Sequence, residues 1–296
     1  PPCSATVITP SPANAQPTSC GPQRSAASAQ SPANWTAPYE PFKLADNLYY
    51  VGTAGLASWL LTTPQGHILI DGAMPTSAKM IEDNIVKLGF KPADVKILLN
   101  THAHFDHSGG LADLKADTGA KLYAAAGDRQ ALETGTYVGS EDVKAFDFKP
   151  VKVDVVLKDG QQVSLGGVSL TAHMTPGHSG GCTTWTFPLN VDGAKREALL
   201  YCSTSVAANR LVSKAKGPQY PGIVEAYQAT FAKLKTMQAD VFLAPHAEQF
   251  GLAGKRAKLA AGAPNSFVDP SELQKVVAAS EAAFKTELAR QQEAAK

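Results

Sequence analysis

Three histidines and an aspartate are crowded into six residues, as His102, His104, Asp106 and His107. Imidazole nitrogens together with a carboxylate oxygen are a ligand mixture that zinc binds in proteins. Such side chains are costly to crowd together in one loop unless something binds them. A structural zinc site or a His-rich surface loop is the alternative, but structural sites close with four protein ligands that are commonly cysteines. The segment therefore predicts a metal centre.

Two more histidines follow predicted strands elsewhere in the chain. His178 lies in a Pro-Gly-His turn after a strand that ends near Met174, and His246 lies in a Pro-His turn after the strand Val241–Ala244. The first His-rich segment follows the apolar run Val95–Leu99, which is bounded like a short buried strand. Chemistry in α/β proteins gathers at loops that leave strand ends. These three segments are therefore expected to converge along one edge of the sheets.

Strands and helices follow one another in two halves of the chain. Apolar runs and alternation predict strands at residues 48–51, 57–61, 67–71, 95–99, 121–123, 162–165, 168–172, 182–187, 198–202 and 241–244. Helical spacing of apolar residues predicts helices at 78–88, 111–119 and 224–234, and a last helix that starts at the cap 269–271. The pair Gly166-Gly167 predicts a hairpin between two of the strands. This layout predicts an α/β fold with two mixed sheets packed together and helices outside.

The start of the chain differs in composition from the rest. Residues 1–34 hold one charged side chain, Arg24, among many Pro, Ser, Ala and Gln residues. Such a segment cannot bury enough apolar surface to offset its ordering entropy, so we expect it to be disordered. A loop closed by Cys3 and Cys20 is compatible with the sequence. We expect a single domain over residues 35–296.

Charge and hydropathy argue against several classes of partner. The formal net charge is +1 and the basic residues form no cluster, which gives no argument for nucleic-acid binding. No apolar run approaches the roughly 18 residues of a membrane span. The sequence has no initiator Met and no apolar signal core, so we expect that any export signal has already been removed. We expect a small-molecule substrate, no membrane partner and a monomer.

The motif His-x-His-x-Asp-His, with the Pro-Gly-His and Pro-His turns, resembles the metallo-β-lactamase superfamily over roughly residues 35–250. That resemblance implies an αββα sandwich and two zinc ions, which can share a water molecule and make hydroxide available at neutral pH. The implied ligands are three histidines for the first ion, then an aspartate and two histidines for the second: His102, His104 and His178, then Asp106, His107 and His246. Asp71, before Gly72, matches an aspartate that braces the first loop in that family, although it could be a turn residue.

The segment between the second and third His turns narrows the resemblance. Glyoxalase II and many phosphodiesterases of the superfamily carry a bridging aspartate there, whereas this chain has no Asp from Gly193 to Ala239. β-Lactamases lack that aspartate. Their third subclass, B3, binds the second zinc by Asp-His-His and carries a small residue, commonly Ser, where the other two subclasses have a ligand Cys. Ser205 fits this role, and the sequence segment Ser203–Arg210 resembles the third subclass.

The resemblance to class B β-lactamases implies a zinc-dependent hydrolase of penicillins, cephalosporins and carbapenems that confers antibiotic resistance. A zinc-bound hydroxide would attack the strained lactam carbonyl, and Asp106 would orient that hydroxide. Ser205, and more weakly Ser203, would hydrogen-bond the substrate carboxylate, although serine is common in loops. Another hydrolase of the superfamily, a lactonase or thioesterase, is the alternative. A zinc-binding protein without catalysis is the third hypothesis.

Cys182 and Cys202 have three interpretations: buried free thiols, a disulfide between neighbouring strands, or Cys202 as a zinc ligand. Because the implied second zinc already has three protein ligands, we favour the disulfide, which fits an exported enzyme that is periplasmic or secreted. His67 and His173 stand alone on strand-like runs and are expected to be surface or packed residues. Substrate preference would depend on loops such as Leu132–Ser140, which carry no recognisable motif.

Overall fold

The computed structural model describes residues 31–263 and 266–296. Most of the segment predicted to be disordered, and the pair Cys3 and Cys20, lie outside these residues. The first regular element is the 3-10 helix η1 (Ala33–Trp35), so regular structure begins two residues before the predicted boundary at Trp35. Residues Pro32–Lys296 form one compact unit.

A seven-stranded sheet occupies the first half of this unit. Its strands follow the sequence order β1 (Phe42–Ala45), β2 (Leu48–Tyr50), β3 (Trp59–Thr63), β4 (Gly66–Ile70), β5 (Val95–Leu99), β6 (Lys121–Ala125) and β7 (Val155–Leu157). Neighbours from β1 to β4 are antiparallel, and those from β4 to β7 are parallel. The parallel strands place their carboxyl ends, and the loops that follow, at one edge of the sheet.

A five-stranded sheet is formed by the second half. Its order is β12 (Val241–Leu243), β11 (Ala194–Leu200), β10 (Thr183–Val191), β9 (Val168–Met174) and β8 (Gln162–Leu165). Only β11 and β12 run parallel among these strands. The hairpin predicted at Gly166-Gly167 joins β8 to β9, and both glycines have positive φ, which a two-residue hairpin turn requires.

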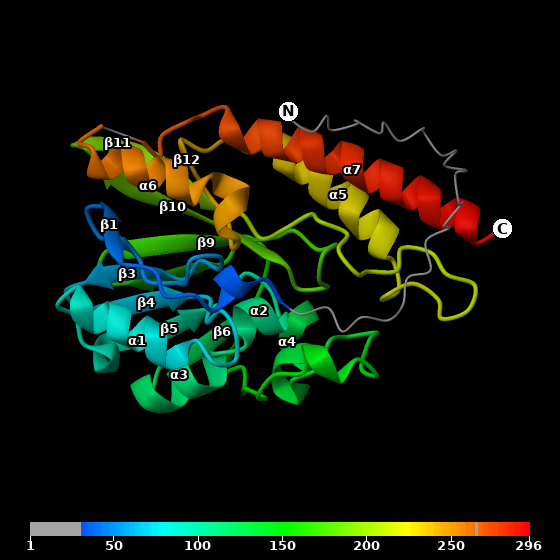
Figure 1. The fold of residues 1–296 in the computed structure, drawn as a ribbon, viewed down its shortest axis with the longest axis horizontal. Coiled ribbons are helices and arrows are strands. Elements are labelled where there is room, and N and C mark those ends of the chain that lie inside the picture. The colour runs from blue at the N-terminus through cyan, green and yellow to red at the C-terminus, as the bar shows by residue number, and fades with distance from the viewer. Residues whose placement is uncertain (1–30, 264–265) are drawn as a thin grey trace, which may run out of the picture. The chain divides into compact units, whose positions relative to one another are not determined.

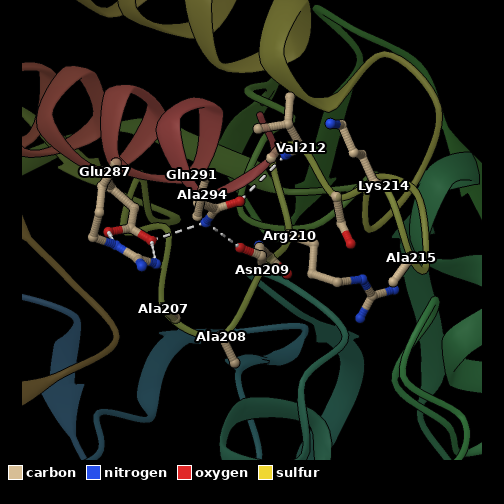
Figure 2. A pocket seen from close by; sticks show the side chains of 13 residues that line it. Ala207, Ala208, Asn209, Arg210, Val212, Lys214, Ala215, Glu287, Gln291 and Ala294 are labelled. Atoms are coloured by element: carbon tan, nitrogen blue, oxygen red, sulfur yellow. Dashed lines mark hydrogen bonds and ion pairs between the residues drawn. The ribbon is translucent and has the colours of Figure 1, made fainter. Parts of the chain in front are cut away.

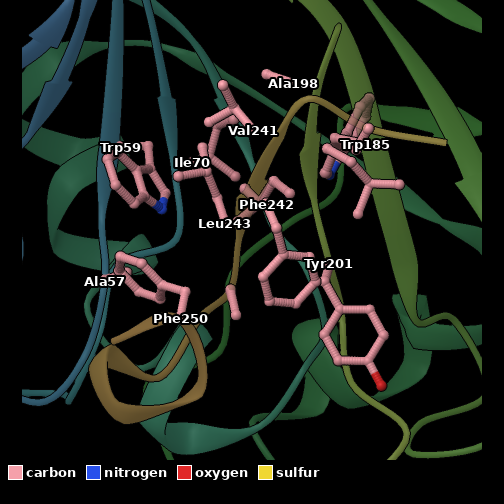
Figure 3. Packing of buried hydrophobic residues seen from close by; sticks show 14 of the residues in the cluster. Ala57, Trp59, Ile70, Trp185, Ala198, Tyr201, Val241, Phe242, Leu243 and Phe250 are labelled. Atoms are coloured by element: carbon pink, nitrogen blue, oxygen red, sulfur yellow. The ribbon is translucent and has the colours of Figure 1, made fainter. Parts of the chain in front are cut away.

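The main hydrophobic core lies between the two sheets. In β4, Ile68 and Ile70 belong to this core, whereas Leu69 points to the opposite face and packs with the helices there. This alternation explains why the strand is apolar at every position, because both of its faces are covered. Figure 3 shows Trp59 of the first sheet and Phe242 of the second among the side chains that fill the space between them.

Helices cover the outer face of each sheet (Figure 1). On the seven-stranded sheet lie α1 (Ala78–Lys87), α3 (Leu111–Thr118) and α4 (Ala126–Thr134); on the other side lie α5 (Ile223–Thr236), α6 (Leu252–Ala260) and α7 (Glu272–Ala294). Short 3-10 helices occur at η2 (Pro92–Asp94), η3 (Lys144–Phe146) and η4 (Ala247–Phe250). The predicted αββα sandwich is confirmed. Within the described residues, no helix has both the length and the apolar character to cross a membrane.

Among the helices and strands, α2, α4, α6, β1 and β7 were absent from the prediction. The His-rich segment is not entirely a loop, because Phe105–Ser108 forms a single helical turn, α2. Four residues are too few to show a helical period. Helix α4 buries only a few side chains, and α6 buries Leu252 alone, so neither has a marked apolar stripe.

Candidate metal centre

The six side chains predicted to bind metal meet where three loops leave the sheets. They are His102, His104, Asp106 and His107 after β5, His178 between β9 and β10, and His246 after β12. Five of them are buried and His246 is partly exposed. The third turn is held in place by a β-bridge between His246 and Leu56, in the loop between β2 and β3.

The first set of three histidines forms a compact triangle. The ring centroids of His102, His104 and His178 lie 4.6 to 4.7 Å apart, and one ligand atom from each lies within 4.8 Å of the others. Nδ1 of His178 contacts the carbonyl oxygen of Ser205 at 2.7 Å, which leaves its Nε2 free. Nδ1 of His102 lies 3.1 Å from the Thr101 hydroxyl, whereas its buried Nε2 has no hydrogen-bond partner among the described residues. An orphaned buried nitrogen of this kind fits a metal ligand.

The second set converges even more closely. Oδ2 of Asp106 lies 3.2 Å from Nε2 of His107 and 3.5 Å from Nε2 of His246. The two imidazole nitrogens are 3.1 Å apart. Two such nitrogens facing one another need either a shared proton or a metal ion between them. Zinc with bonds of about 2.0–2.1 Å in a tetrahedron would place its ligand atoms about 3.4 Å apart, so these separations fit zinc.

Burial keeps the imidazoles of the first set neutral. It lowers the pKa of His102 and His104 well below the ordinary value, and neighbouring histidines add to the effect. It lowers the pKa of His178 to about 4. Neutral imidazole is the form that binds a metal, so the first set needs no deprotonation at neutral pH.

In the second set, Asp106 and His107 shift the pKa of one another. Burial raises the pKa of the Asp106 carboxyl, but His107 and, more weakly, His104 and His246 together lower that pKa below its ordinary value. Burial lowers the pKa of His107, but Asp106 raises that pKa above its ordinary value. Burial lowers the pKa of His246 to about 3. A divalent cation binds the neutral form of His107, and its charge would then face the Asp106 carboxylate.

Asp71 braces the loop that carries the first histidines. The residue is buried directly after β4 with φ of 64°, a conformation that non-glycine residues rarely adopt. Its carboxylate accepts hydrogen bonds from the backbone N–H of Thr101 at 2.7 Å and from the Thr101 hydroxyl at 2.9 Å. Burial raises the pKa of Asp71 to about 6. These contacts favour the bracing role over that of an ordinary turn residue.

Of the two candidate substrate serines, Ser205 is exposed and Ser203 is buried. The Ser205 hydroxyl lies 3.3 Å from Nδ1 of His178 and 3.2 Å from the Ser203 hydroxyl. Ser203 is buried, and its hydroxyl accepts a hydrogen bond from the backbone N–H of Ser205 at 3.2 Å. Ser205 is therefore the better placed to touch a substrate, and Ser203 orients it.

Cys182 and Cys202 form a disulfide. It joins the start of β10 to the segment after β11, and it excludes both the free-thiol interpretation and Cys202 as a zinc ligand. The Cys202 sulfur also lies 3.6 Å from Nδ1 of His102, on the side of the ring away from the orphaned Nε2.

Replacing both cysteines by serine is expected to lower the free energy of unfolding by about 3 kcal/mol. The disulfide closes a loop with a sequence separation of 20 residues, and a loop of that length constrains the unfolded chain by about this amount. Urea unfolding of the Cys182→Ser/Cys202→Ser variant, beside wild type with and without reductant, measures the loss. An unchanged midpoint in the variant and in reduced wild type would contradict the expectation.

The remaining histidines pack away from the centre, as expected. The buried His67 ring lies edge-on to Phe90 at 5.2 Å. Nε2 of His173 hydrogen-bonds the Thr186 hydroxyl at 2.8 Å. Neither residue contributes to the metal centre.

Aromatic residues beside the centre carried no signal in the sequence. The ring of Tyr137 stacks on His104 with centroids 4.2 Å apart, and Trp35 lies 5.2 Å from His246. Phe105 continues this wall at 6.3 Å from Trp35. These rings come from three separate segments, so only the fold reveals that they border one site.

Asn209 links the metal centre to the last helix. Its side chain donates to the carbonyl of His178 at 2.8 Å and accepts from the Tyr137 hydroxyl at 2.8 Å. Figure 2 shows the other side of this loop, where Gln291 of α7 donates to the Asn209 carbonyl at 3.1 Å and accepts from the backbone N–H of Val212 at 3.2 Å. The loop that carries Asn209 is thereby fixed from both sides.

Comparisons with known proteins agree with this geometry. Residues 54–191 match a family model described as the metallo-beta-lactamase superfamily. The chain is 51% identical to BJP-1, a subclass B3 metallo-beta-lactamase of Bradyrhizobium japonicum, over 89% of this chain and 99% of that one, with a TM-score of 0.86. It is 41% identical to the FEZ-1 metallo-beta-lactamase from Legionella gormanii, over 87% of this chain and 98% of that one, with a TM-score of 0.83.

A curated relative is more distant. A hydroxyacylglutathione hydrolase of Methylococcus capsulatus is 29% identical over 143 residues, which are 48% of this chain and 44% of that protein. This chain therefore spans less than half of the length of that relative.

Proposed function

The chain belongs to the metallo-β-lactamase superfamily and to its subclass B3, and on that premise we propose that it hydrolyses the amide bond of β-lactam rings. The proposed substrates are penicillins, cephalosporins and carbapenems. The observation that carries the proposal is the set of six side chains, three histidines beside an Asp-His-His group, at the end of an αββα sandwich. The similarity to BJP-1 over almost all of that chain supports it.

We further propose that the centre holds two zinc ions. His102, His104 and His178 would bind the first, and Asp106, His107 and His246 the second. Zinc bound there would polarise the lactam carbonyl and lower the pKa of a coordinated water molecule. The neutral histidines of the first set, the ionised Asp106 and the orphaned Nε2 of His102 support this assignment.

The residues of the chain have separate tasks around the reacting amide. The Asp106 carboxylate accepts a hydrogen bond from the attacking water and thereby orients it. The exposed Ser205 hydroxyl donates a hydrogen bond to the substrate carboxylate, and Ser203 holds that hydroxyl in place. Trp35 and Phe105 offer apolar surface to substrate substituents beside His246. No side chain is required as a nucleophile.

The segment after β11 favours a lactam over a thioester. Superfamily members with a bridging aspartate would have it near Leu200–Val206, where this chain places Cys202 in a disulfide. A centre without that aspartate leaves the second metal position more open to a leaving nitrogen. Initial rates on a penicillin, a cephalosporin and a carbapenem, beside a lactone and a glutathione thioester, test the proposal. Turnover of the lactone or the thioester without turnover of any lactam would overturn it.

We propose that the enzyme acts in the periplasm or outside the cell and confers resistance to β-lactams. The Cys182–Cys202 disulfide supports an oxidising compartment, since such bonds are rare in the cytosol. The net charge of +1 supports a small-molecule substrate rather than nucleic acid. We propose that the enzyme is a monomer.

Replacing Ser205 by alanine is expected to raise KM for β-lactams roughly 10- to 100-fold with a smaller change in kcat. One hydrogen bond to a charged group is worth roughly 1.5–3 kcal/mol, and this one would form in both ground and transition state. Steady-state kinetics measure the changes in KM and kcat separately. Ser164→Ala is a matched control, because Ser164 also pairs with another serine, Ser169, but on the β8–β9 hairpin. An unchanged KM in Ser205→Ala would remove Ser205 from the substrate site.

A further inference from the structure

We propose that Asp128 is a positioning residue that sets the geometry of the first metal site by joining the two loops that carry its three histidines. The inference rests on the proposed function, since it concerns the proposed first zinc site. This role was not predicted from the sequence, because Asp128 lies outside the His-rich segments, in the first turn of α4.

The Asp128 carboxylate accepts hydrogen bonds from both loops. Oδ2 accepts from the backbone N–H of Ala103 at 2.8 Å, and Ala103 lies between His102 and His104. The same oxygen accepts from the Ser179 hydroxyl at 3.1 Å, directly after His178. Oδ1 accepts from the backbone N–H of Gly181 at 2.8 Å.

Close backbone contact fixes α4 against the turn that carries His178. A Cβ on Gly127 would lie 2.2 Å from the carbonyl oxygen of Gly180, and a Cβ on Gly181 would lie 2.6 Å from Cγ of Asp128. Both distances are shorter than any real contact, so these positions require glycine. The helix and the turn therefore approach closely enough for Asp128 to be held by direct hydrogen bonds.

Because the Asp128 carboxylate is buried, it must keep its hydrogen bonds to both loops. Asp128 is only 2% exposed, and burial raises its pKa to about 6, which leaves it an anion at neutral pH. A buried anion is costly unless hydrogen-bonded, and its three donors are neutral groups from two loops. Moving either loop would leave the charge with too few donors. Asp71, by contrast, braces only the first loop, at Thr101.

Zinc affinity at each site, measured on the full chain, tests the proposal. The first site is isolated in a His246→Ala background and the second in a His104→Ala background, and each dissociation constant is measured by competition with a chelator. Asp128→Asn is expected to weaken the first site about 10- to 100-fold, the usual effect of removing a partner that orients metal ligands, and the second site less than about 3-fold. The absorption spectrum of Co²⁺ in the first site is expected to shift as well.

Asp154→Asn is the matched control. Asp154 also accepts a backbone N–H, from Leu122 at 2.8 Å, but at the start of β6 and outside the metal centre. Its substitution is expected to leave both dissociation constants and the Co²⁺ spectrum unchanged. Ser179→Ala removes a single donor to Asp128 and is expected to weaken the first site about 3-fold or more, in the same direction.

The zinc affinities and the Co²⁺ spectrum decide whether Asp128 is a positioning residue. Wild-type zinc affinity and an unshifted Co²⁺ spectrum in Asp128→Asn, or equal weakening of both sites, would overturn the positioning role while leaving the proposed function intact. If Asp128→Asn does not fold, an unchanged first site in Ser179→Ala overturns it. A wild-type protein that binds neither zinc nor cobalt would overturn the proposed function and this inference together.

Discussion

Replacing His102 by alanine is expected to lower β-lactam turnover by more than about 1000-fold, because the first metal loses a ligand that no neighbour replaces. Within residues 31–263 and 266–296, the buried Nε2 of His102 has no hydrogen-bond partner, and the nearby sulfur atoms are joined in the Cys182–Cys202 disulfide. Steady-state rates measure the loss, and zinc content is expected to fall from two equivalents to about one. The fold is expected to persist, because the two sheets and their core do not depend on this imidazole.

His173→Ala provides the control for removing a half-buried imidazole. His173 lies on β9 and contacts Thr186 rather than the metal centre, so its replacement is expected to leave turnover unchanged. Circular dichroism of both variants establishes that they are folded. A folded His102→Ala enzyme with turnover within about 10-fold of wild type would show that the first metal site is wrongly assigned.

Replacing Asp106 by alanine is expected to abolish turnover to a similar extent, for two reasons that act together. The carboxylate is the only anion in the second ligand set, and it is also the group proposed to orient the attacking water. Asp106→Asn keeps the shape of the side chain but removes its charge, so it is expected to lose turnover as well. The fall is expected in kcat more than in KM.

Zinc content separates the two tasks of Asp106. If Asp106→Asn retains two zinc equivalents and still loses turnover, the loss of turnover is caused by the lost orientation of the attacking water. If it retains one zinc equivalent, the loss of turnover is caused by the loss of a metal ligand. Near-normal rates in Asp106→Ala would contradict the assignment of the second site.

Much of the fold could be predicted from the sequence because its strands are strongly apolar. Strand β5 was predicted at the observed bounds, since Val95–Leu99 is a short apolar run closed at both ends by polar residues. Strand β7 (Val155–Leu157) was missed because it has three residues and two of them are partly or fully exposed. The turn of α2 was missed because its helical character depends on the surrounding contacts rather than on its own periodicity.

The candidate ligands could be predicted because their types and spacing are unusual, but the residues that position them could not. His102 to His107 form a motif that is visible in a single stretch of six residues. Asp128 lies 25 residues from Ala103 and 53 residues from Gly181, and nothing in its own neighbourhood indicates that it meets either. Trp35 similarly reaches His246 only through the fold. Contacts of this kind depend on how distant segments pack, which a single sequence does not specify.

The most direct test of zinc-dependent β-lactam hydrolysis is turnover of a penicillin, a cephalosporin and a carbapenem before chelation, after chelation and after zinc is restored, with zinc counted at each step. We expect turnover of all three substrates with two zinc ions per chain, loss of turnover with the metal-free protein, and recovery as the second equivalent of zinc is added. Turnover that survives complete removal of metal, or a two-zinc protein that hydrolyses none of the three, would contradict zinc-dependent β-lactam hydrolysis by this protein.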